Sequence, residues 1–186
     1  MTVTNTRTRR SRQAGFTLID LLFVIALIGL LSALAVPGLM RAQGAAQASS
    51  AVGSLNVINS AELSFAISCG SGFYSPDLPT LGIKPPGAIE AYLPTELTSG
   101  FTIIKSGYLL SLAGVPLAGT PATCNGLGAG STSAGYAAVA DTLNPGSAAP
   151  KYFGTNTDGM VYEHTATLSA TMPETGAPVA GSLMKQ

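Results

Sequence analysis

The sequence predicts an α+β protein in which a long N-terminal helix packs against a small antiparallel sheet. An apolar run at 16–40, a stripe with helical spacing after it, and short β-prone segments near the C-terminus support this fold class. We therefore expect a chain in five parts. They are a basic segment at 1–15, an apolar helix at 16–40, its amphipathic continuation at 41–69, a head at 70–165 and an exposed tail at 166–186.

The apolar run at 16–40 has the length of a membrane span. A helix rises about 1.5 Å per residue, so the run exceeds a hydrocarbon core of about 30 Å. Asp20 is unexpected there, because a charge at the membrane centre costs about 2.5–3.5 kcal/mol and marks a functional candidate. The arginines that precede the run are a cytoplasmic-side topology signal, with no acid among them: Arg7, Arg9, Arg10 and Arg12.

A stripe with helical spacing continues beyond Arg41, where the aliphatic content falls. Its members recur at alternating steps of four and three residues: Ala51, Leu55, Ile58, Glu62, Phe65 and Cys69. We therefore expect one helix from near Phe16 to near Ser68, whose second half packs against the head.

The head is predicted to begin with a loop and to continue as an antiparallel sheet. Prolines and glycines interrupt residues 70–100, which argues for a loop. The turn at 156–159, Asn-Thr-Asp-Gly, joins the last two strand candidates into a hairpin. The strand candidates are 101–105, 107–113, 135–140, 151–155 and 160–165.

Composition argues against several classes of function. The formal net charge is zero and the head has no basic block, so no nucleic-acid partner is predicted. His164 is the only histidine, it lies on a strand candidate, and no catalytic motif surrounds it. No spacing of the acids nominates a catalytic pair. We expect no enzyme, no cofactor and no metal site.

Two cysteines, Cys69 and Cys124, are expected to form a disulfide if the head lies outside the cytoplasm. Such a bridge would tie the end of the helix to the head. Two free, buried thiols are the alternative.

The segment Gly15-Phe16-Thr17-Leu18-Ile19-Asp20 resembles the processing site of type IV prepilins and pseudopilins. In that family a membrane peptidase cuts after the glycine, and the new N-terminal residue is N-methylated. An acid stands at the fifth mature position and a proline further along the helix. The resemblance thus implies cleavage between Gly15 and Phe16, methylation of Phe16, and assembly roles for Asp20 and Pro37. The family usually has glutamate where this chain has Asp20.

The resemblance also suggests why an acid lies in the apolar run. Cleavage would leave a protonated amine on Phe16, one helical turn from Asp20. We expect Asp20 of an incoming subunit to meet the Phe16 amine of a subunit already in a fibre. The alternative is an acid that merely reaches water at the interface. Pro37 is expected to mark a soft point of the helix, or simply to end the membrane segment.

The leading hypothesis is a major or minor pilin of a type IV pilus-like filament. Its partners would be copies of itself, a prepilin peptidase and assembly platform proteins, first at the inner membrane and then in a filament outside it. One rival is a type II secretion pseudopilin. Its major form has a C-terminal calcium site, whereas residues 165–186 hold only one acid, Glu174. A less favoured rival is a secreted binding protein whose signal peptide is cut near Val36.

Overall fold

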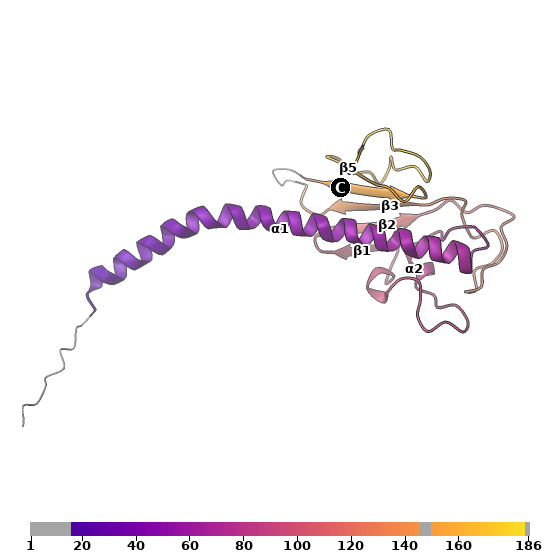
Figure 1. Cartoon of the computed structure of the whole chain (residues 1–186), viewed down its shortest axis with the longest axis horizontal. Helices are drawn as coiled ribbons and strands as arrows, with labels where there is room; N and C mark the ends of the chain where they lie inside the picture. The colour runs from indigo at the N-terminus through magenta and orange to yellow at the C-terminus, as the bar shows by residue number, and fades with distance from the viewer. Residues whose placement is uncertain (1–15, 146–149, 185–186) are drawn as a thin grey trace, which may run out of the picture. The chain divides into compact units, whose positions relative to one another are not determined.

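The computed structural model describes residues 16–145 and 150–184 (Figure 1). One helix, α1 (Leu18–Ser68), is followed by the two short helices α2 (Leu78–Leu81) and η1 (Thr95–Leu97). Six strands then form a single sheet: β1 (Thr102–Lys105), β2 (Tyr108–Ala113), β3 (Ala137–Thr142), β4 (Tyr152–Asn156), β5 (Val161–His164) and β6 (Ser182–Leu183). The predicted α+β class is confirmed.

The sheet is antiparallel throughout, and its strand order follows the chain from β1 to β6. The expected hairpin between β4 and β5 turns through Gly159, which has a positive φ of 72° that glycine adopts without strain. One row across the inner face pairs four buried residues on neighbouring strands: Ile103, Leu110, Ala140 and Phe153.

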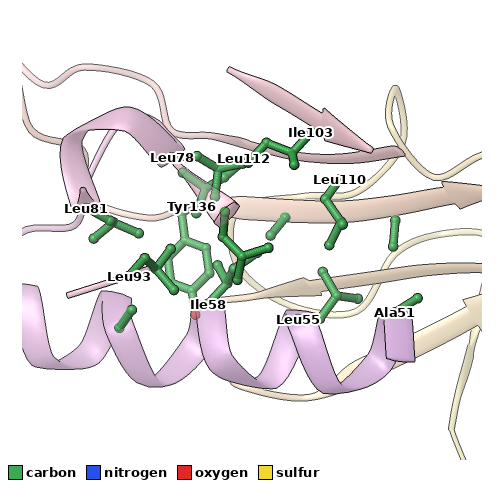
Figure 2. Packing of buried hydrophobic residues seen from close by; sticks show 14 of the residues in the cluster. Ala51, Leu55, Ile58, Leu78, Leu81, Leu93, Ile103, Leu110, Leu112 and Tyr136 are labelled. Carbon is green, nitrogen blue, oxygen red and sulfur yellow. The ribbon is translucent and has the colours of Figure 1, made fainter. Parts of the chain in front are cut away.

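The chain divides into two compact units, one up to Gln43 and one from Gly44 onward. In the first unit every described residue is exposed. In the second, the rest of α1 lies along the inner face of the sheet (Figure 1). Figure 2 shows Leu55 and Ile58 of α1 directed toward Leu110 of β2 and Tyr136, which directly precedes β3.

All six residues of the predicted stripe are buried, at 5% exposure or less. A residue at every third or fourth position of a helix faces the same side, so the stripe forms one buried seam that is apolar except at Glu62. This confirms the packing that the spacing predicts for the second half of α1.

The segment 70–100 is not the plain loop that its prolines suggest. Asp77 caps α2, because its Oδ1 accepts a hydrogen bond of 2.9 Å from the backbone N–H of Thr80. Proline fits the first turn of a helix, where its missing N–H would have no partner in any case. The segment also contributes buried core residues: Leu78, Leu81, Leu93 and Leu97.

The prediction of an exposed tail is wrong at three positions, because Leu168, Met172 and Pro178 are buried. Leu168 and Met172 are buried against Val139 and Tyr162 on the outer face of the sheet, where they form a second small core. One turn of chain brings them together, since the N–H of Met172 donates to the carbonyl of Leu168 at 2.8 Å. The tail then adds β6 to the edge of β5.

Candidate functional site

The start of α1 is held by reciprocal hydrogen bonds between Thr17 and Asp20. The Oδ2 atom of Asp20 accepts from the backbone N–H of Thr17 at 3.1 Å and from its hydroxyl at 2.6 Å. The N–H of Asp20 approaches the Thr17 hydroxyl oxygen at 3.4 Å. Thr17 immediately precedes the helix and Asp20 is its third residue, so the pair forms a capping box. The carboxylate is thereby directed toward the end of the helix that carries Phe16.

The predicted cleavage bond joins Gly15, which lies outside the described residues, to Phe16, which is 83% exposed. From Phe16 to Ala46 every side chain is exposed, although most of them are apolar. α1 is the one helix in the described part of the chain that is long and apolar enough to cross a membrane. A signal sequence would pass the same test, so this property alone does not identify the segment.

Pro37 lies inside α1, and the helix continues beyond it to Ser68. Proline has no N–H to donate to the preceding turn, so it removes one backbone hydrogen bond from the helix. The helix is therefore weakened at Pro37 without ending there. A role for this weak point in assembly stays a prediction.

A disulfide joins Cys69 to Cys124, with their Cα atoms 4.9 Å apart. Cys69 comes directly after the last residue of α1, and Cys124 lies in the long connection between β2 and β3. The bridge therefore fixes the end of the helix to the sheet-forming part of the head.

The structure does not bring the other chemically active residues together. His164 ends β5, and its Nδ1 accepts a hydrogen bond of 3.0 Å from the N–H of Ala166. Across residues 16–145 and 150–184, no group of three or more His, Cys, Asp or Glu residues could hold a metal ion. Glu163 pairs with Lys151 at 3.0 Å.

One acid has an environment that sequence reasoning did not anticipate. Glu62 is completely buried on α1, and its Oε2 accepts a hydrogen bond of 2.9 Å from the N–H of Ser75. Burial raises the pKa of Glu62 to about 8, while the bond from Ser75 lowers it and the charge of Asp77 raises it further. The sequence feature that could have predicted this burial is the position of Glu62 within an otherwise apolar stripe.

Comparison with known families finds a match that spans the start of α1. Residues 10–36 match the family model described as the prokaryotic N-terminal methylation motif. No curated protein and no solved structure matches the chain significantly.

The chain thus carries the type IV pilin-like prepilin signature at its N-terminus, ahead of a pilin-like α+β head. This motif is that of a type IV pilin-like or pseudopilin substrate of prepilin processing. It points to a structural subunit rather than an enzyme, and an apolar first helix of this kind fits the inner membrane before assembly.

Proposed function

We propose that this chain is a structural subunit, a major or minor pilin, of a type IV pilus-like filament. The observation that carries the proposal is the agreement in register between the methylation motif at 10–36 and the start of α1. The expected cleavage bond precedes the helix by two residues, and the acid falls in its first turn. Processing would therefore leave almost nothing of the chain ahead of the helix.

The exposed apolar surface of the first half of α1 supports a role in assembly. A soluble protein rarely leaves so many large apolar side chains uncovered, and such surfaces mark membrane or protein contacts. A lipid bilayer would cover this surface before assembly, and the same segment of neighbouring subunits would cover it in the filament. The head retains its own buried core in either setting.

Asp20 is proposed to set the axial register of the filament. Cleavage after Gly15 would place a protonated amine on Phe16, and opposite charges about 4 Å apart attract by roughly 4 kcal/mol at an effective dielectric of 20. A buried ion pair adds little net stability, but it can specify which subunits align. The hydrogen bonds from Thr17 support this role, because they direct the carboxylate toward the helix end where the amine would lie.

The pseudopilin alternative shares the same motif and helix. The only acid of residues 165–186 is Glu174, and its Oε1 accepts a hydrogen bond of 2.6 Å from the N–H of Val115. A carboxylate engaged in this way, with no second acid beside it in that segment, does not favour the calcium site expected of a major pseudopilin.

The first test is the N-terminal sequence and intact mass of the protein recovered from its native membranes and filaments. We expect a chain that begins at Phe16 and is heavier by one methyl group. A chain that begins near Val36 would instead identify a secreted protein, and it would remove most of the apolar half of α1. That result would end the filament proposal.

A further inference from the structure

The buried carboxyl group of Glu62 lies at the joint between α1 and the chain segment that follows it. Its neighbours on the stripe are Ile58 and Phe65, which are both fully buried. Through the N–H of Ser75, its Oε2 connects α1 to the segment 74–77, which leads from the end of α1 into α2. The second oxygen, Oε1, is buried and has no hydrogen-bond partner.

Among the described residues, no cation forms an ion pair with Glu62. The only ion pair in residues 16–145 and 150–184 is that of Lys151 with Glu163, which involves neither Glu62 nor the segment 74–77. The ionisable groups coupled to Glu62 are Asp77 and Tyr136, and Tyr74 lies beside Tyr136; none of the three is a cation. A carboxylate here would be a buried charge with one hydrogen bond, which is strongly unfavourable.

The surroundings of Glu62 are also closed to water. Tyr136 is 2% exposed, and its hydroxyl donates to the Oδ1 of Asn59 at 2.9 Å, so it is already engaged with α1. Its ring packs against that of Tyr74 with centroids 5.2 Å apart. The joint therefore cannot solvate a charge on Glu62 without opening.

We propose that Glu62 is a proton-dependent latch, which holds α1 against segment 74–77 when its carboxyl group is protonated and loosens this joint when the proton is lost. In the closed state the proton resides on the carboxyl group. In the opened state water solvates the carboxylate, so each opening at neutral pH releases one proton to the solvent.

The direction of the pH effect follows from the two pKa values. The pKa is about 8 in the closed state and near 4.5 when the side chain reaches water. Between these values the closed state holds a proton that the open state has lost, so raising the pH favours opening. The joint is tightest below about pH 4.5, loosens up to about pH 8, and changes little above that.

The test is amide hydrogen exchange of the full processed chain in detergent micelles, measured from pH 5 to 9. After correction for intrinsic exchange, protection of residues 55–68 and 74–77 should fall by up to about tenfold per pH unit up to pH 8 and then level off. In Glu62→Gln the amide oxygen can still accept from Ser75, so protection should not depend on pH in this range. The matched control Glu96→Gln, at an exposed acid of η1, should follow the unmodified protein.

Parallel pH profiles for Glu62→Gln and the unmodified protein would overturn the proposal. If Glu62→Gln does not fold, infrared spectroscopy of the unmodified protein gives a separate answer. A protonated carboxyl band should persist at pH 6–7, where exposed carboxyl groups are ionised, and should lose about half of its intensity near pH 8. Absence of that band at pH 6 would also overturn the proposal.

Discussion

The two halves of α1 have the same backbone conformation and opposite surroundings. Up to Ala46 every described residue is exposed, and leucine, isoleucine, valine and phenylalanine occur on all sides of the helix. From Ala51 onward the apolar residues gather on one stripe that is buried against the sheet. A helix that is apolar all round needs a covering from outside its own chain, whereas an amphipathic helix finds it in the fold. The comparison therefore separates a half whose apolar surface the head does not cover from a half whose apolar stripe the head buries.

The largest expected effect is on assembly, from a change in the first half that leaves the head intact. Asp20→Ala removes the carboxylate that is proposed to pair with the Phe16 amine, so filaments visible by electron microscopy should be lost. Membrane insertion and the unfolding midpoint of the head should be unchanged, because Asp20 is exposed and its side-chain hydrogen bonds among the described residues are with Thr17.

The matched variant Asp20→Glu restores the residue usual in the related family and keeps the charge, so it should still assemble. Normal filaments from Asp20→Ala would show that the carboxylate does not set the register.

The next effect tests the burial difference with one chemical change in each half. Leu55 is completely buried and Leu31 is 66% exposed. Leu55→Ala should lower the free energy of unfolding of the head by about 2–5 kcal/mol, because it removes buried methyl groups and leaves a cavity. Leu31→Ala should leave that free energy within about 0.5 kcal/mol of the unmodified value. Urea denaturation in micelles, followed by near-ultraviolet circular dichroism, measures both, and equal losses would contradict the division of α1.

A somewhat smaller effect should follow from loss of the disulfide that fixes the end of the second half. The double variant Cys69→Ser/Cys124→Ser should lose about 2–4 kcal/mol of head stability, because the unfolded chain regains the freedom of a long closed loop.

Reductant should lower the stability of the unmodified protein by a similar amount and should not affect the variant. Cys124 is exposed, so reagent can reach the bridge. An unchanged midpoint for the variant would mean that packing along the stripe suffices to hold the helix end.

Features that depend on local pattern were predictable from the sequence. The stripe from Ala51 to Cys69 follows from helical periodicity, and the five predicted strands occur with ends that differ by one or two residues. The β4–β5 turn follows from its Asp-Gly pair. The likeness of Gly15 to Asp20 to a prepilin site agrees with the family match at residues 10–36.

Features that depend on distant partners were missed. Leu168 and Met172 appear isolated in a polar tail, and only Val139 and Tyr162, brought to the outer face of the sheet by strand pairing, make their burial favourable. The sequence analysis did not predict α2, because proline usually interrupts regular structure. Here the Asp77 side chain caps a short helix, and Pro79 lies in its first turn, where proline is tolerated.

The sequence by itself determined the helix, its division into an all-apolar half and a striped half, and the processing motif, because each depends on the order of neighbouring residues. Only the tertiary structure decided that the tail packs on the sheet and that Glu62 has lost contact with water. The physical reason is that burial is a property of the assembled fold. The same glutamate on an exposed face of α1 would be an ordinary charged residue, and here the surrounding core makes its ionisation costly.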